Sequence, residues 1–164
     1  MASTSELEWL ETNARGSFAL ACVDRKLRRK YHALLTVRDP GRGEPWNVLA
    51  ETRETLSAGA ASTLLVDPLS TISAKDTPFT FQSQPHATHI YLLQDGRVEL
   101  ARSVRLGARD QVEVHFRVRA RGEVPPLSLQ IEPLLRCRPL HALTHENPFL
   151  DGTCVKLGDE VRML

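Results

Sequence analysis

The sequence predicts an all-β fold, an antiparallel β-sandwich with little helix. Short apolar runs alternate with polar residues at the two-residue period of a strand, most clearly in Val112–Val118. Turn-forming Gly, Pro and Asp residues separate these runs. Signals for the start and end of helices are sparse. Many short strands joined by turns are typical of two sheets packed face to face.

The N-terminal half holds two predicted strands, Tyr31–Val37 and Asn47–Thr52. Asp39–Gly43 between them is a predicted turn, because its proline fixes one backbone dihedral and its glycines supply positive φ. The polar start, Ser3–Leu10, has two interpretations: a capped helical turn, or a segment that leads directly into a strand. Small side chains make Ala58–Ser62 a predicted loop.

The C-terminal half contains the clearest hairpin. His89–Leu93 and Val98–Val104 flank Asp95-Gly96, and Asp-Gly between two apolar runs predicts a tight turn with positive φ at both residues. Val112–Val118 then alternates with polar residues as a half-buried antiparallel strand does. Leu127–Ile131 repeats the same period, so we expect a further strand there.

Length and charge limit the function classes. A chain of 164 residues suits one domain, and we treat 1–164 as one. Lys plus Arg total 21 and Asp plus Glu total 20, a balance that argues against nucleic-acid binding and against docking on an anionic membrane. No apolar run approaches the roughly 18 residues of a membrane span, and Met1–Glu8 lacks the features of a leader. We therefore expect a cytoplasmic protein.

The sequence holds no familiar catalytic or cofactor motif. It has no G-x-S-x-G elbow, no phosphate-binding glycine loop and no H-E-x-x-H. Asp and Glu are scattered, so spacing alone places no catalytic acid pair. Cys22, Cys137 and Cys154 are odd in number and far apart, which predicts free thiols rather than disulfides or a paired zinc site. We expect no metal and no cofactor.

Histidines and a basic run are the remaining polar candidates. His86 and His89 are spaced as metal ligands can be, but no cysteine or carboxylate is spaced to join them. His141 and His145 would share one face of a helix, which nearby prolines keep short. Solvent-exposed or hydrogen-bonded histidines are the simpler interpretation of both pairs. The basic run Arg25–Lys30 is either a solvated loop or a contact to an anion, a partner or a neighbouring domain.

Two motifs near the N-terminus are distinctive. Glu8–Ala19 reads E-W-L-E-T-N-A-R-G-S-F-A, and Arg29–Leu35 reads R-K-Y-H-A-L-L. Together they resemble the start of bacterial and archaeal-type glycogen debranching enzymes. Members of that family open with E-W-L-x-T-N-G-L-G-G-[YF]-A and continue with T-R-R-Y-H-G-L-L. Weaker similarities at Leu49–Leu56, Asp95–Leu100 and Pro133–Leu143 extend the resemblance over nearly the whole chain.

The chain departs from the family pattern at its glycines. The family's G-L-G-G reads Ala14–Ser17 here, and only Gly16 is kept. The family's T-R-R reads Arg28–Lys30, and the glycine after Tyr-His is Ala33. Glycine gives access to positive φ and to close backbone approach. These departures indicate a divergent member of the family. They predict that its loop geometry is altered, and with it its partner or ligand.

The resemblance implies a supersandwich-like N-terminal β-domain over 1–164, placed ahead of a catalytic (α/α) barrel that is absent from this chain. In the family that barrel holds the catalytic carboxylates and hydrolyses α-1,6 linkages of glycogen-like glucans. The implied function is non-catalytic support of the barrel, with the downstream catalytic domain as partner and an α-glucan as a further one. The alternative is a free-standing carbohydrate-binding or protein-interaction module. No set of residues in the sequence supports an independent enzyme, and we expect no catalytic residue in this chain.

Five motif residues are candidates for substrate binding or for the domain interface. Three of them have a structural alternative: Trp9 as core, Asn13 as a turn residue, and His32 as a structural histidine. Strand alternation predicts that Tyr31 and His32 point in opposite directions. The functional interpretation places these side chains at the edge that faces the catalytic domain and bound glucan. The candidates are Trp9, Asn13, Arg29, Tyr31 and His32.

Overall fold

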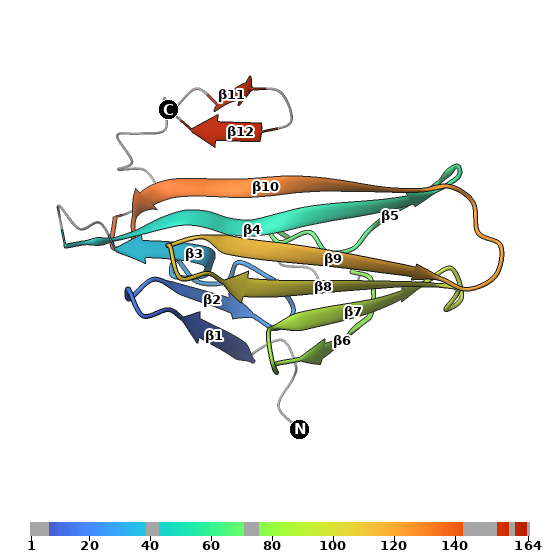
Figure 1. Cartoon of the computed structure of the whole chain (residues 1–164), viewed down its shortest axis with the longest axis horizontal. Coiled ribbons are helices and arrows are strands. Elements are labelled where there is room, and N and C mark those ends of the chain that lie inside the picture. Colours follow the sequence, from blue (N-terminus) through green and yellow to red (C-terminus); the bar gives the residue numbers. More distant parts are fainter. Residues whose placement is uncertain (1–6, 39–42, 71–75, 143–153, 158–159, 164) are drawn as a thin grey trace.

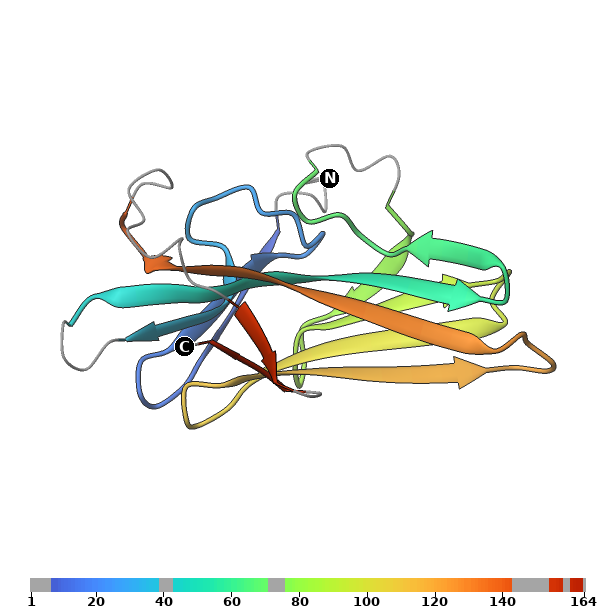
Figure 2. The same ribbon diagram turned by 90° about the horizontal axis from the view of Figure 1, so that it is seen from above.

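Strands dominate the computed structural model, which describes residues 7–38, 43–70, 76–142, 154–157 and 160–163. Every helix or strand assigned in this part is a strand, and the all-β sandwich prediction is confirmed. Two antiparallel sheets form the two layers of the molecule (Figures 1 and 2). The strands are β1 Glu8–Thr12, β2 Phe18–Cys22, β3 Ala33–Arg38, β4 Pro45–Ala58, β5 Ala61–Leu64, β6 Phe79–Gln82, β7 Thr88–Leu93, β8 Val98–Leu106, β9 Val112–Ala120, β10 Leu127–Pro139, β11 Cys154–Leu157 and β12 Glu160–Met163.

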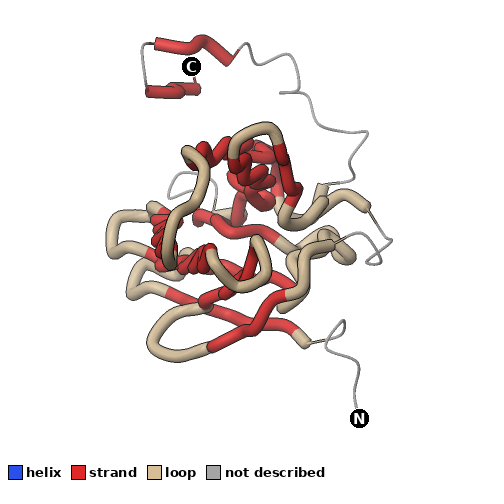
Figure 3. The backbone as a smooth tube through the Cα atoms, turned by 90° about the vertical axis from the view of Figure 1, so that its right-hand side faces the viewer, coloured by secondary structure: helices blue, strands red, loops and turns tan. Residues whose placement is uncertain are grey.

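The first sheet has the order β1-β2-β3-β4-β10, and β5 pairs with the second half of β4. The second sheet has the order β6-β7-β8-β9. β11 and β12 pair with each other. Strands account for most of the described backbone in the tube drawing (Figure 3). In these strand orders, β1 and β10 are edges of the first sheet, and β6 and β9 are edges of the second.

Two apolar clusters fill the space between the sheets. One surrounds Trp9, Leu34 and Val104 and joins β1, β2 and β3 to β8. The other surrounds Tyr91 and Leu100 and joins β4 to β7 and β8. β8 contributes to both because its alternate residues point inward. Each large apolar side chain buried in this way stabilises the fold by roughly 1.5–3 kcal/mol.

The predicted hairpin is confirmed, with a longer turn than expected. Leu93 lies opposite Val98, so the four residues 94–97 that separate the predicted strands connect β7 to β8, and no inner pair closes on Asp95-Gly96. Three of them in succession have positive φ: Gln94 at 54°, Asp95 at 54° and Gly96 at 81°. The Asp-Gly pair therefore supplies two of the three left-handed positions that reverse the chain.

Two predicted boundaries are wrong. Ala58–Ser62 is not a loop, because the chain reverses at Gly59, with φ +59°, and Ala61 pairs with Ala58 in a β4–β5 hairpin. Tyr31 and His32 lie in the turn that precedes β3 rather than in the strand. The turn between Ala58 and Ala61 is shorter than the predicted loop, and β3 begins two residues later than the predicted strand.

The described residues cover some predicted segments only in part. The stretch Ser3–Leu10 is a strand from Glu8 onward, and its first residues lie outside the described part. Of the turn Asp39–Gly43, only Gly43 is described, and its φ of +69° is the expected left-handed value. His145 lies outside the described residues. Among the residues described, no helix has the length and apolar character needed to cross a membrane.

Candidate functional site

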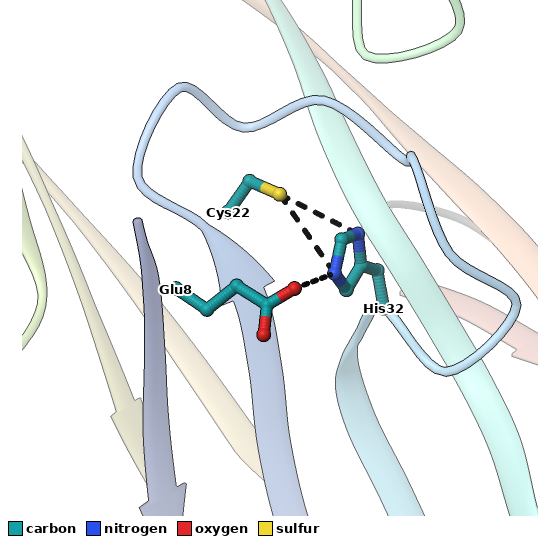
Figure 4. Close-up of side chains that lie close together, drawn as sticks. All are labelled: Glu8, Cys22 and His32. Atoms are coloured by element: carbon teal, nitrogen blue, oxygen red, sulfur yellow. Dashed lines mark hydrogen bonds and ion pairs between the residues drawn. The ribbon is translucent and has the colours of Figure 1, made fainter. Parts of the chain in front are cut away.

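Glu8 and His32 join the two signature motifs. Glu8 begins β1, and His32 ends the connection from β2 to β3. Oε1 of Glu8 lies 2.9 Å from Nε2 of His32 (Figure 4). The backbone N–H of Arg29 donates to Nδ1 of His32 at 3.3 Å, so Nε2 carries the proton that is donated to Glu8. The His32 side chain is 0% exposed, which makes this link part of the interior.

Cys22 completes the cluster from the end of β2. Its Sγ lies 3.7 Å from both ring nitrogens of His32. At equal distances from both ring nitrogens, the sulfur does not align with either one. Burial raises the pKa of the Cys22 thiol, and a hydrogen bond with Arg28 offsets only part of that rise. The geometry lacks the aligned thiol and base of a cysteine hydrolase.

The same three residues are the candidate metal ligands of the described part. One ligand atom each from Glu8, Cys22 and His32 lies within 4.8 Å of the others, and all three types bind zinc. A metal at Nε2 would move the histidine proton to Nδ1, where it would meet the N–H of Arg29. The Arg29 guanidinium also lies 3.1 Å from Glu8. These contacts favour a hydrogen-bonded structural cluster over a metal centre.

Asn13 holds the β1–β2 turn to the far sheet. Its Oδ1 accepts from the backbone N–H of Arg15 at 3.0 Å and of Ser17 at 3.1 Å. Its Nδ2 donates to the carbonyl of Gly107, at the end of β8, at 2.9 Å. Gly16 in the same turn has φ +84°. The one glycine that this chain keeps from the family's G-L-G-G is thus the one that needs a left-handed backbone.

Beside that turn, Asp110 connects the β8–β9 loop to the β1–β2 hairpin. Its carboxylate accepts a hydrogen bond from the Ser17 hydroxyl and pairs with Arg15 at 3.0 Å. The bond from Ser17, followed by that from Asn13, lowers the pKa of Asp110 below its usual value. The motif turn is therefore fixed by contacts within the domain.

The three other candidate residues have different surroundings. Trp9 is 8% exposed and belongs to the core, so little of its ring is free to stack on a sugar. Tyr31 is 36% exposed and meets His141 edge-on at 6.1 Å, while His32 is buried, so the two side chains point in different directions although both residues precede β3. Arg29 has a largely exposed side chain beside Glu8. The structure gathers Arg29 and His32 around Glu8, and it leaves Tyr31, Asn13 and Trp9 outside that cluster.

The side chains of His86 and His89 do not face a common site. His89 is buried against Phe79 and Phe81, and its Nε2 donates to the carbonyl of Val23 at 2.7 Å. Burial, with Arg102 and Arg25 nearby, lowers the pKa of His89 well below its ordinary value. His86 instead lies 3.2 Å from Glu11. The two rings have separate partners, and neither pairing is that of a metal site.

A buried ionic network lies between the sheets, and the sequence patterns did not predict it. Arg25 follows β2, Glu51 and Glu54 lie on β4, and Arg102 lies on β8. Arg25 is 2.6 Å from Glu54 and 3.3 Å from Glu51, and Arg102 pairs with both carboxylates. All four side chains are at most 1% exposed. Two positive and two negative charges therefore balance within the interior.

This network corrects the solvated-loop interpretation of the basic run. Arg25 has φ 63° and donates to the hydroxyl of Tyr91 at 3.0 Å in addition to its carboxylates. Lys26 is 2% exposed and lies 2.7 Å from Asp76. The first two cations of the run point into the fold because acidic partners lie there, on β4 for Arg25 and in the connection from β5 to β6 for Lys26. The exposed residues of the run begin beyond them, as at Arg29.

The fold and these contacts define an all-β sandwich domain whose signature residues bind one another and hold its turns. The chain belongs to the glycogen debranching enzyme N-terminal family, whose model matches residues 7–163. The resemblance noted from Glu8–Ala19 and Arg29–Leu35 is thereby confirmed. No curated protein and no solved structure matches the chain.

Proposed function

We propose that this chain is a non-catalytic domain of a glycogen debranching-type enzyme, which supports an α-1,6-glucosidase barrel. The family match over residues 7–163 carries the proposal. The chemistry of the interior supports it. Glycoside hydrolysis needs two carboxylates that flank an accessible glycosidic bond. Glu51 and Glu54 are a buried pair of carboxylates, and two guanidiniums neutralise them out of reach of any substrate.

A cytoplasmic setting forms part of the proposal. Cys22 is a free thiol, which fits a reducing compartment. The near balance of 21 basic and 20 acidic residues supports a protein partner rather than nucleic acid or an anionic membrane.

The test uses the reading frame beyond codon 164. Where that frame encodes a helical barrel, the whole protein and a form that lacks residues 1–164 are compared for melting temperature and for glucose release from phosphorylase-limit dextrin. The proposal predicts a lower melting temperature and lower activity without the domain. Equal values for the two forms would contradict a supporting role. A stop codon at that point would favour the second candidate.

The second candidate is a free-standing carbohydrate-binding module. One observation favours it: a pocket of about 270 Å³ beside β1 is lined by the apolar Phe81 and Pro85 and by the polar Glu11 and His86.

A further inference from the structure

Among the described residues, no strand pairs with the far edge of β9, the last strand of the order β6-β7-β8-β9 (Figure 1). Main-chain hydrogen bonds close the β8–β9 pair at both ends, from the N–H of Gly107 to the carbonyl of Gln111 and from the N–H of Arg121 to the carbonyl of Arg97. The register between them is unbroken, so the odd-numbered residues of β9 bond to β8. The even-numbered residues therefore direct their N–H and C=O groups toward the open edge.

The other edges of the two sheets carry features that discourage pairing, and β9 does not. β1 has five residues, and β5 and β6 have four each. β10 is longer, but it contains Pro133 and Pro139, and its register shifts after Leu134. Short length, proline and irregular register are the usual means by which an edge strand avoids another chain. β9 has nine residues, no proline and no register shift.

The side chains of β9 leave both of its faces open to a further strand. Val114 and Phe116, on the inward face, are only partly buried against the two apolar clusters, and Val118 is 40% exposed. On the outward face, the side chains of Glu113 and Arg119 are 41% and 62% exposed. A strand added at this edge would cover the apolar row and meet both charges.

The sequence of β9 is complementary to itself. When two antiparallel copies meet with Phe116 opposite Phe116, all nine residues pair. Glu113 then lies opposite Arg119, and Val114 lies opposite Val118. The two-fold axis repeats each of these pairs, and cross-strand pairs of opposite charge or of β-branched side chains stabilise a sheet. A shift of two residues in either direction would leave the ends of the strands unpaired.

We propose that two copies of this chain associate through β9 and join their four-stranded sheets into one continuous antiparallel sheet. Such a contact is isologous, because the same strand serves both copies. The pairing of Glu113 with Arg119 is the reason that the occupant is a second copy rather than an unrelated strand. His115 faces Arg117 in this register, which an uncharged imidazole allows. The inference goes beyond the proposed function and does not depend on it.

The first test is analytical ultracentrifugation of the 164-residue chain over a roughly hundredfold range of concentration, since the dimer fraction rises by mass action. We expect a reversible approach to twice the 18.3 kDa of one chain. A chain that stays monomeric throughout would overturn the proposal. Growth beyond the dimer would also overturn it, because a two-fold contact is closed.

Charge reversal tests the register. Glu113→Arg and Arg119→Glu each place like charges opposite one another twice, so we expect each variant alone to dimerise about tenfold more weakly. An equimolar mixture of the two variants restores both opposite-charge pairs, and we expect it to form a mixed dimer. A local effect of either substitution on the fold of its own chain would not be rescued by mixing.

Glu132→Arg is the matched control, because it makes the same change of charge on β10, the edge of the other sheet. We expect it to leave dimerisation unchanged. Dimerisation that is weakened as much by Glu132→Arg as by Glu113→Arg would overturn the β9 contact, as would a mixture of Glu113→Arg and Arg119→Glu that stays monomeric. The melting temperature of each variant shows that the chain remains folded.

Discussion

Glu54 on β4 and Arg102 on β8 form an ion pair that joins the two sheets from inside the sandwich. Nε of Arg102 lies 3.1 Å from Oε1 of Glu54, and neither side chain is exposed. The other carboxylate oxygen of Glu54 lies 2.6 Å from Arg25. Both oxygens are therefore engaged by guanidinium groups, the arrangement in which a buried charge is tolerated.

Replacement of Glu54 by Ala leaves two buried guanidiniums short of a negative charge. We expect a loss of about 3–5 kcal/mol in the free energy of unfolding, since removal of one partner of a buried ion pair leaves the other charge buried and unpaired. Urea unfolding followed by circular dichroism measures the change. Glu132→Ala is the control, because Glu132 pairs with Arg53 at a half-exposed position and its loss should cost less than about 1 kcal/mol. Equal losses for both variants would contradict the buried network.

The network also predicts acid sensitivity. Burial opposes the ionisation of Glu54, but Arg25 and Arg102 prevail and lower its pKa below the ordinary value of 4.5. The unfolded chain therefore takes up a proton at Glu54 before the folded chain does. This contribution to stability is complete above pH 4.5 and is lost as the pH falls from there through the folded-state pKa. Unfolding free energies at pH 7, 5, 4 and 3 test this, and Glu54→Gln should show a shallower decline below pH 4.5.

His89 predicts a second and separate pH window. Its folded-state pKa lies well below 6.5, because burial and two nearby guanidiniums disfavour the charged ring. The unfolded chain binds a proton at this residue below pH 6.5 while the folded chain does not, so stability declines as the pH falls from 6.5 toward the folded-state value. The stability difference between pH 7 and pH 5 should shrink in His89→Gln. An unchanged difference would show that His89 titrates normally in the fold.

The Glu8–His32 link predicts that the family motifs are structural in this chain. Glu8→Ala removes the acceptor for the buried Nε2 proton, which should cost about 1–3 kcal/mol. Thermal unfolding measures it, with the exposed Glu123→Ala as a control expected to change stability by less than about 0.5 kcal/mol. A Glu8→Ala variant as stable as the control would show that the link contributes nothing.

The burial of Cys22 predicts slow alkylation. The residue is 2% exposed, and burial raises the pKa of its thiol. Iodoacetamide should leave Cys22 unlabelled in the folded chain at pH 8 and label it fully in urea, as peptide mass spectrometry would show. Rapid labelling of Cys22 without denaturant would contradict the closed cluster.

Sequence patterns predicted the fold well because a strand with one buried face leaves a two-residue period. β8 shows this, with Val98 and Leu100 inward. The same period places Arg102 on the inward face, and that was the available signal for the ionic network. The partners of Arg102 lie 48 and 51 positions away on β4, so their pairing depends on how the sheets pack and cannot be read from spacing.

The candidate site was predicted less completely. The motif comparison identified Asn13 and His32 as special, and the structure shows both in dense hydrogen-bond networks within the domain. Their contact with glucan or with a catalytic domain stays a prediction. Glu11 lies inside the motif, but the sequence gave no sign of its contact with His86, because the two residues are 75 positions apart.

The central claim is that this domain serves a debranching enzyme without performing the reaction itself. The most direct measurement is glucose release from phosphorylase-limit dextrin by the purified 164-residue chain, at concentrations high enough to detect slow turnover. We expect no glucose above the buffer control. Glucose release that co-purifies with the folded chain and disappears in a carboxylate variant such as Glu11→Gln would contradict it and would place an active site within this sandwich.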